Sequence, residues 1–312
     1  MATITLLGPQ QDQPILKDVL DEQGIEGPLA VITCGWEERE EEQDELEQHV
    51  KRKTTNLRLY ARWEQVFNED NALRQALEDR NDRLRTIQTL YRRRLDPALQ
   101  AVWELHDLTM ARMELLLAER SDALRAVAQL DAHYLQQIRS VHTAFEDVWC
   151  PSERPAVAAV RDALREQIRG AKAVLIAGGD VGVLSDRLRL FDLPSLLPGR
   201  PVIGWSAGAM ALTERIILFH DSPPYGRGNP EVYDDGLALC PNVIALPHAT
   251  TRLRLNDRTR VSIFAGRFKP ATCVALDKGS GLVWDGSSFR AIGRARRLDA
   301  ARGKLIGMAA PQ

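Results

Sequence analysis

Short apolar runs alternate with longer amphipathic segments near both ends of the chain. Apolar runs of this length, bounded by polar, glycine or proline residues, are typical of buried strands. Because they alternate with segments of helical periodicity, we predict an α/β fold in which helices cover a mostly parallel sheet in three layers. The predicted strands are residues 4–7, 29–33, 173–177, 201–203, 243–246, 273–276 and 282–284.

The middle of the chain has a different pattern, because apolar residues recur there at helical spacing. None of the 21 glycines lies between residues 36 and 169. Leu73 and Leu77 belong to one apolar helix face, and a second face extends over residues 124–148. Two such faces are expected to pack together. We predict about three long helices, near residues 38–94, 97–118 and 121–149.

These helices are predicted to form a hairpin or a small bundle that is inserted into the α/β fold. Asp96-Pro97 is a typical helix start, and Ser121 is a candidate N-cap for the last helix. The predicted α/β domain therefore comprises residues 1–36 and 151–312, and residues 37–150 form the helical insertion.

A Gly-Trp-Ser-Ala-Gly segment, residues 204–208, follows the predicted strand 201–203 and precedes a segment compatible with a helix. A strand, a sharp turn and a helix would present Ser206 as an exposed nucleophile. The glycines allow a tight turn, and the first N–H groups of the new helix are unpaired where an oxyanion would form. Because this pattern also occurs by chance, a simple glycine-rich turn is the alternative.

A glycine pair follows another predicted strand, in the segment Ile176-Ala177-Gly178-Gly179-Asp180. Sheets of this type bind ligands beyond the carboxyl ends of their strands. The N–H of Gly179 could therefore join that of Ala207 as an oxyanion hole. The alternative is an ordinary turn between a strand and a helix.

His248 is the best candidate for a general base, because it directly follows the predicted strand 243–246. His220 is a weaker competitor in a loop. Its neighbour Asp221 lies in a turn-prone segment that could carry an acid to orient the base. The remaining histidines, in the predicted helical segment, are His49, His106, His133 and His142.

The composition is that of an ordinary globular protein, with 44% apolar residues, a net charge of −2 and a pI near 6.3. This balance gives no electrostatic reason to expect nucleic acid or an anionic membrane as a partner. The amino terminus lacks the pattern of a signal peptide, so we expect a cytoplasmic protein. The four cysteines are scattered, which predicts neither a zinc site nor disulfides.

The carboxyl-terminal half resembles the peptidase S51 family, which contains aspartyl dipeptidase (peptidase E) and cyanophycinase. The resemblance implies a fold like that of class I glutamine amidotransferases, here with a long helical insertion, and cleavage next to aspartyl residues by a serine nucleophile. It covers residues 155–295 well and residues 1–35 weakly. The matching segments are Gly178-Gly179-Asp180, residues 204–209, residues 236–241, and Pro247-His248 with Arg252 and Arg254.

Carried over by position, the resemblance implies that Ser206 attacks the substrate and that His248 removes its proton. Gly179 and Ala207 would supply the oxyanion N–H groups. Asp221 matches the acidic position of the dipeptidase branch.

Other positions bear on the acid and on the substrate. Asp234 and Asp235 are rival acids for orienting the base. Asp180 and Arg252 are expected at the substrate, with Arg252 pairing with a carboxylate. The substrate preference stays open, because Val181 and Ala249 depart from the residues usual in the family.

We therefore predict a serine peptidase that hydrolyses small aspartyl or isoaspartyl peptides through an acyl-enzyme on Ser206, without a metal or a cofactor. We expect a homo-oligomer, with the helical insertion as a candidate contact between copies. The alternative is a repurposed amidotransferase-like scaffold or binding protein whose helices mediate assembly. Such a scaffold would have no chemical need for Ser206 and His248, and a glutamine amidotransferase would need a cysteine at position 206.

Overall fold

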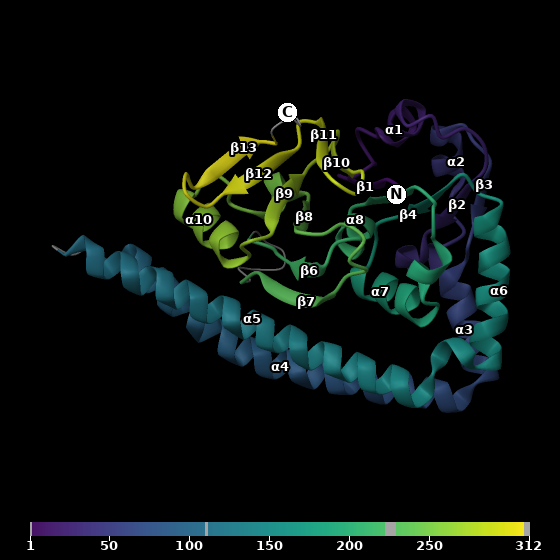
Figure 1. Ribbon diagram of the computed structural model, residues 1–312, viewed down its shortest axis with the longest axis horizontal. Helices are drawn as coiled ribbons and strands as arrows, with labels where there is room; N and C mark the ends of the chain where they lie inside the picture. The colour runs from purple at the N-terminus through teal and green to yellow at the C-terminus, as the bar shows by residue number, and fades with distance from the viewer. Residues whose placement is uncertain (1, 110–111, 222–228, 309–312) are drawn as a thin grey trace.

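A computed structural model describes residues 2–109, 112–221 and 229–308 of the chain (Figure 1). Within these residues the main sheet has seven strands. Five neighbouring strands pair in parallel. The remaining two strands, at one edge of the sheet, pair antiparallel. The predicted mostly parallel sheet is thus confirmed. From edge to edge the strands are β3 (Thr54–Asn56), β2 (Leu29–Ile32), β4 (Ala173–Ile176), β5 (Val202–Trp205), β1 (Ile4–Leu7), β10 (Ser280–Trp284) and β11 (Phe289–Gly293).

Helices cover both faces of this sheet, as the three-layer prediction requires. Successive side chains of a strand point to opposite faces, and in β2 the pair Leu29 and Val31 packs in one apolar core while Ala30 and Ile32 pack in the other. The first core is closed by α1 (Leu16–Glu22) and α2 (Asp44–Val50), and the second by α3 (Leu59–Glu69), α6 (Pro155–Arg169) and α7 (Val181–Leu190).

Two of the predicted strands belong to a second sheet rather than to the main one. Alternation of strands and helices predicts parallel pairing but does not specify which strands are neighbours. The helix α8 (Ala207–Ala211) packs on β5 of the main sheet and on β8 of the second sheet, and so joins the two. The second sheet consists of β8 (Val243–Pro247), β9 (Thr272–Leu276), β12 (Arg296–Asp299) and β13 (Lys304–Gly307), and a separate ribbon consists of β6 (Arg215–Leu218) and β7 (Glu231–Asp235).

The long helical insertion is a hairpin of two antiparallel 37-residue helices, α4 (Asn71–Asp107) and α5 (Met113–Trp149) (Figure 1). Their apolar faces pack together, as the sequence predicted. Tyr91 and Tyr134 stack between the helices with ring centroids 4.1 Å apart.

The predicted breaks within these helices are wrong. The helix α4 continues through Pro97, and Ser121 lies inside α5. A proline inside a helix removes one hydrogen bond, but Leu95 and Leu99 on either side of Pro97 are buried in the core. Packing along the hairpin therefore offsets the lost bond.

The segment between β2 and the hairpin is not the start of a long helix, so the predicted helix 38–94 is wrong in its first half. This segment forms a short 3₁₀ turn, Cys34–Arg39, and then α2, β3 and α3. Thr54 and Thr55 are β-branched residues, which favour a strand. The prediction of a helix gave more weight to the absence of glycine from this part of the chain. Because β3 pairs with β2, it belongs to the main sheet and not to a separate helical unit.

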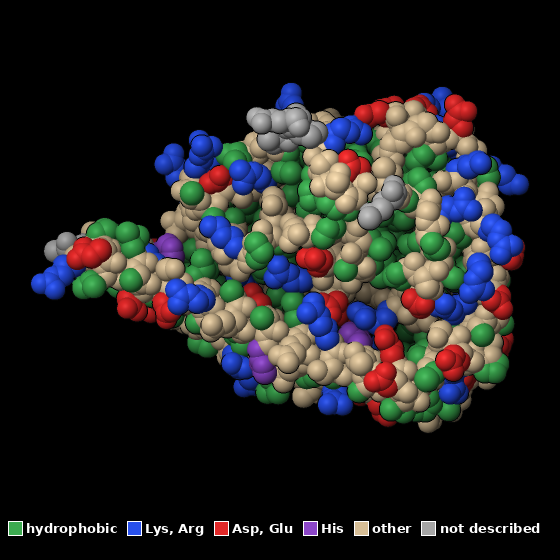
Figure 2. All heavy atoms as spheres, viewed as in Figure 1, with side chains coloured by type: hydrophobic (Ala, Val, Ile, Leu, Met, Phe, Trp, Pro, Cys, Tyr) green, Lys and Arg blue, Asp and Glu red, His purple; other side chains and the backbone are tan. Residues whose placement is uncertain are grey.

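The hairpin lies along β7 and α10 (Arg258–Arg267), so most of it is attached to the α/β part (Figure 1). The Tyr134 hydroxyl donates to the carbonyl of Tyr233 in β7 at 2.9 Å. The far end of the hairpin projects beyond the body, and acidic and basic side chains are interspersed over the visible face (Figure 2). None of the described helices combines the length and the apolar character needed to cross a bilayer.

Candidate active site

Ser206 lies at a sharp turn between β5 and α8. Its backbone has φ 51° and ψ −120°, a conformation that costs energy for any residue with a side chain. Its N–H donates to the carbonyl of Leu7 in the neighbouring strand at 3.2 Å. Gly208 is required here, because a Cβ at this position would lie 2.2 Å from the carbonyl oxygen of Ile176. The turn holds the half-buried Ser206 at the wall of a pocket of about 700 Å³.

The glycine pair after β4 lies directly against the serine. A Cβ on Gly178 would lie 2.8 Å from the Cβ of Ser206. Gly179 has φ +112°, and a Cβ there would be 2.0 Å from the carbonyl oxygen of Gly35. Neither the N–H of Gly179 nor that of Ala207 donates a hydrogen bond within the described part of the chain. Both residues line the pocket beside Ser206, so two unused donors are available for a developing oxyanion.

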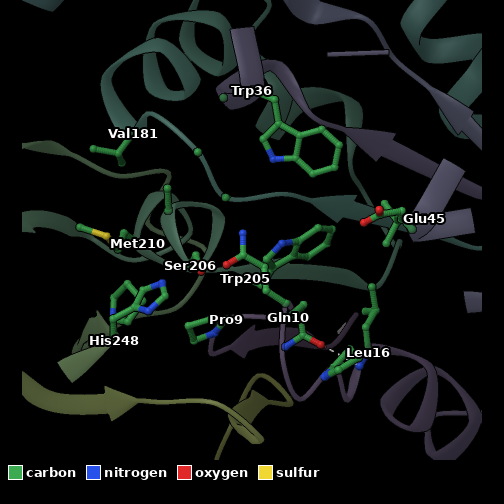
Figure 3. A pocket seen from close by; sticks show the side chains of 18 of the residues that line it. Pro9, Gln10, Leu16, Trp36, Glu45, Val181, Trp205, Ser206, Met210 and His248 are labelled. Carbon is green, nitrogen blue, oxygen red and sulfur yellow. Dashed lines mark hydrogen bonds between the residues drawn. The ribbon is translucent and has the colours of Figure 1, made fainter. Parts of the chain in front are cut away.

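His248 lines the same pocket and lies beside Ser206 in Figure 3. It follows β8 directly, and its N–H donates to the carbonyl of Leu276 in β9 at 3.2 Å. Burial, followed by the charge of Arg252, lowers the pKa of His248 below its usual range, and the charge of Asp277 opposes this shift. A neutral imidazole at neutral pH can accept a proton.

Asp221 is buried, but its carboxylate is directed to groups other than the His248 ring. It accepts hydrogen bonds from the guanidinium of Arg260 and, at 3.0 Å, from the N–H of Arg254. The N–H of Asp221 donates to the carbonyl of Arg252 at 2.7 Å. Asp221 therefore fixes the segment that follows His248.

The two rival acids face the helical hairpin. Asp234 accepts from His142 at 3.2 Å, and Asp235 pairs with Arg139 at 2.8 Å. Among the residues that the structure describes, no carboxylate forms a hydrogen bond with the His248 ring.

Asp277 is the acidic residue that the structure brings to His248 and that sequence reasoning missed. Pro247 and Leu276 are register partners in the parallel strands β8 and β9, so the next residues, His248 and Asp277, leave the sheet side by side. One oxygen of Asp277 accepts from the N–H and the hydroxyl of Thr250, both at 2.9 Å. The available signal was that Asp277 directly follows a predicted strand at the same sheet edge as His248.

Of the two residues expected to contact the substrate, Asp180 and Arg252, the structure places only Arg252 in the pocket. The Asp180 carboxylate accepts from the N–H of Val183 at 2.8 Å and caps α7. Asp180 does not line the pocket, whereas Arg252 does. Within the described residues, no group of three or more His, Cys, Asp or Glu side chains has a geometry suited to a metal ion.

The wall of the pocket opposite His248 comes from Trp36 and from the start of the segment that was predicted to be helical. Trp36 follows β2, and Glu42, Glu45 and His49 come from α2 and the turn before it. This wall is joined to the glycine pair, because the N–H of Asp180 donates to the carbonyl of Gly35 at 2.8 Å. Sequence reasoning missed the contribution of Glu42, Glu45 and His49 because it assigned residues 38–94 to one helix, and it singled out no role for Trp36.

Comparison with known proteins gives one family match. The sequence model of peptidase family S51 matches residues 125–292. A search of curated proteins gave no match. Among solved structures, the chain is similar to a peptidase from an acI-B1 actinobacterium, with 13% identity, a TM-score of 0.49, and coverage of 100% of this chain and 96% of the other. It is also similar to a candidate peptidase E protein from Listeria monocytogenes EGD-e, with 12% identity, a TM-score of 0.43, and coverage of 96% and 100%. Because the family match spans more than half of the 312 residues and includes both Ser206 and His248, the chain belongs to peptidase family S51.

Proposed function

We propose that this peptidase is a serine enzyme that hydrolyses small aspartyl or isoaspartyl peptides. The observation that carries the proposal is the strained turn at Ser206, which shares one pocket with His248 and with the unused N–H groups of Gly179 and Ala207. Strain of this kind persists where the surrounding structure enforces it and is often found at active sites. A nucleophile, a base and two oxyanion donors are the groups that acyl transfer needs.

The reaction proceeds in two steps. The Ser206 hydroxyl attacks the peptide carbonyl, and His248 takes the hydroxyl proton. The resulting oxyanion accepts hydrogen bonds from the N–H groups of Gly179 and Ala207. The C–N bond then breaks, His248 gives its proton to the leaving amine, and an ester on Ser206 remains. In the second step His248 takes a proton from water, the resulting hydroxide attacks the ester, and the proton returns to Ser206 as the acid product leaves.

Asp277 is the acid that we assign to His248. Its charge acts to raise the pKa of His248, which is the electrostatic effect that stabilises an imidazolium during the reaction. Asp221, by contrast, positions Arg252 through the backbone bond between them.

Arg252 supports the preference for aspartyl peptides. It lines the pocket close enough to His248 for its charge to lower the pKa of the ring. A cation at this point would pair with a free carboxylate of an aspartyl residue whose other carbonyl is attacked.

Hydrolysis of α- and β-aspartyl dipeptides tests the proposal. The native protein and a Ser140→Ala control, which loses a hydroxyl on the exposed face of α5, should cleave at least one linkage type. Ser206→Ala should cleave none. If the folded native protein cleaves none of these peptides, the proposal is wrong, and the scaffold alternative becomes the better account.

A further inference from the structure

The hairpin holds β7 along its whole length (Figure 1). Each of the five residues of β7 forms a hydrogen bond or an ion pair with α4 or α5. The partners, in the order of the strand from Glu231 to Asp235, are Arg92, Tyr91, Tyr134, His142 and Arg139. The position of β7 is therefore set by the two helices of the hairpin.

Tyr233 is an extra residue in this strand. Two neighbouring residues of β6, Ile216 and Ile217, pair with residues of β7 that lie on either side of Tyr233. A bulge of this kind leaves the extra residue outside the ladder and re-aims its side chain, and bulges are frequent next to active sites. The carbonyl of Tyr233 accepts from the Tyr134 hydroxyl instead. The hairpin thus fixes the one residue that β6 leaves unpaired.

The Tyr233 side chain lies against the first turn of α7. A Cβ on Gly182 would lie 2.4 Å from the Tyr233 hydroxyl oxygen, so the phenol occupies the space that a larger residue would need. The hydroxyl forms no hydrogen bond with another described residue, so the two groups meet by packing alone. Burial, followed by the charge of Asp186, raises the pKa of Tyr233, which keeps the hydroxyl neutral.

This turn of α7 is continuous with the glycine that supplies an oxyanion donor. Gly179 precedes Gly182 by three residues, and Val181 between them lines the active-site pocket together with Gly179. Asp180 joins the two parts, because its carboxylate caps α7 at the N–H of Val183. A displacement of the first turn of α7 would therefore move the N–H of Gly179.

A second contact ties α7 to the hairpin one turn further on. The Asp186 carboxylate accepts from the guanidinium of Arg80 in α4 at 2.9 Å, and the Arg80 side chain is 4% exposed. Gly182 and Asp186 are four residues apart and so lie on the same face of α7. The contacts with Tyr233 and Arg80 therefore support one face of this helix.

We propose that Tyr233 is a positioning residue for the oxyanion hole, because it holds the first turn of α7 and with it the N–H of Gly179. The hairpin acts through β7 as the support for this contact. The inference rests on the proposed function, since the oxyanion forms only during the proposed acyl transfer.

Gly182→Ala tests the contact, because the added Cβ meets the Tyr233 hydroxyl. An ordinary contact needs about 1 Å more than the 2.4 Å available, and a misplacement of about 1 Å can cost about a hundredfold in rate. We expect kcat for an aspartyl peptide to fall by at least about tenfold. KM should change little, since the oxyanion bonds form in the transition state. Alanine is the better helix former, so the loss would not come from a weaker helix.

Tyr233→Phe provides the rescue. Without the hydroxyl, the nearest atom of the ring is 3.4 Å from the added Cβ, which is an ordinary contact. In the Tyr233→Phe protein, Gly182→Ala should therefore lower kcat by less than about threefold. Gly170→Ala is the matched control and should keep the native kcat, because the nearest atom to its Cβ would be the Gln167 carbonyl oxygen at 3.6 Å.

Hydrogen exchange in Tyr233→Leu tests the positioning without a substrate. The amides of residues 180–184 should exchange at least about fivefold faster than in the native protein, because their turn loses its support. The amides of residues 272–276 in β9 should exchange at the native rate and serve as the internal control.

Three results would overturn the proposal: a native kcat in Gly182→Ala, an equal loss of kcat with and without Tyr233→Phe, or unchanged exchange at residues 180–184 in Tyr233→Leu. If the native protein cleaves no aspartyl peptide, the proposed function fails, and the exchange rates alone decide whether Tyr233 holds the turn.

Discussion

We expect the ion pair between Arg267 and Asp131, which joins the hairpin to α10, to contribute strongly to the free energy of unfolding. Asp131 lies on α5 and Arg267 at the end of α10, and their side chains are 3% and 1% exposed. Two hydrogen bonds of 2.7 Å join them. The guanidinium also donates to the carbonyl of Pro230 at 2.6 Å and to the Tyr91 hydroxyl at 3.0 Å. Burial acts to lower the pKa of Arg267, but the hydrogen bonds and charge of Asp131 raise it overall.

Asp131→Leu leaves the guanidinium buried without its carboxylate. Breaking a buried pair in this way costs about 3–5 kcal/mol, whereas replacing both partners with apolar residues of similar size costs much less. We therefore expect Asp131→Leu to lower the free energy of unfolding by about 3–5 kcal/mol. The double variant with Arg267→Met should recover much of that loss.

Urea denaturation followed by circular dichroism measures these free energies, and a double-mutant cycle isolates the coupling. Asp82→Asn is the control, since it removes an exposed carboxylate that pairs with Arg85 on the surface of α4, and it should leave the stability almost unchanged. A loss below about 1 kcal/mol in Asp131→Leu, or additive effects in the double variant, would refute the reasoning.

Three further predictions concern the reaction. The acidic limb of the pH profile of kcat/KM should have a midpoint below about 6.5, because His248 must be neutral to act as a base and burial lowers its pKa; Arg252→Gln should move that midpoint to higher pH by removing a positive charge. Gly179→Ala should lower kcat by about a hundredfold or more, because a Cβ 2.0 Å from the carbonyl oxygen of Gly35 would shift the backbone and move the oxyanion donor N–H out of place; single-turnover hydrolysis on protein shown to be folded measures the effect. Asp277→Asn should lower kcat by at least about tenfold and move the acidic limb to lower pH, and an unchanged pH profile would show that Asp277 does not act on His248.

The sequence predicted the parts of the fold that depend on local pattern. Apolar runs such as residues 173–177 became buried parallel strands, since burial on both faces requires them to be apolar throughout. Ser206, Gly179 and His248 each follow such a strand, and the structure brings all three into one pocket. The predicted family is confirmed by the family match.

The features that were missed depend on tertiary contacts. Nothing local distinguishes a proline that ends a helix from Pro97, which the packing of Leu95 and Leu99 keeps inside one. Asp277 becomes a neighbour of His248 only through the pairing of β8 with β9. Trp36 reaches the pocket only because β2 lies next to β4 in the sheet.

The central claim is a covalent intermediate on Ser206, and mass spectrometry of protein quenched during turnover tests it most directly. With an aspartyl peptide that the native protein cleaves, the account predicts that the proteolytic fragment containing Ser206 gains the mass of one aspartyl acyl group. The Ser206→Ala protein should show neither the adduct nor hydrolysis. Hydrolysis by Ser206→Ala at the native rate, with no adduct in either protein, would contradict the account.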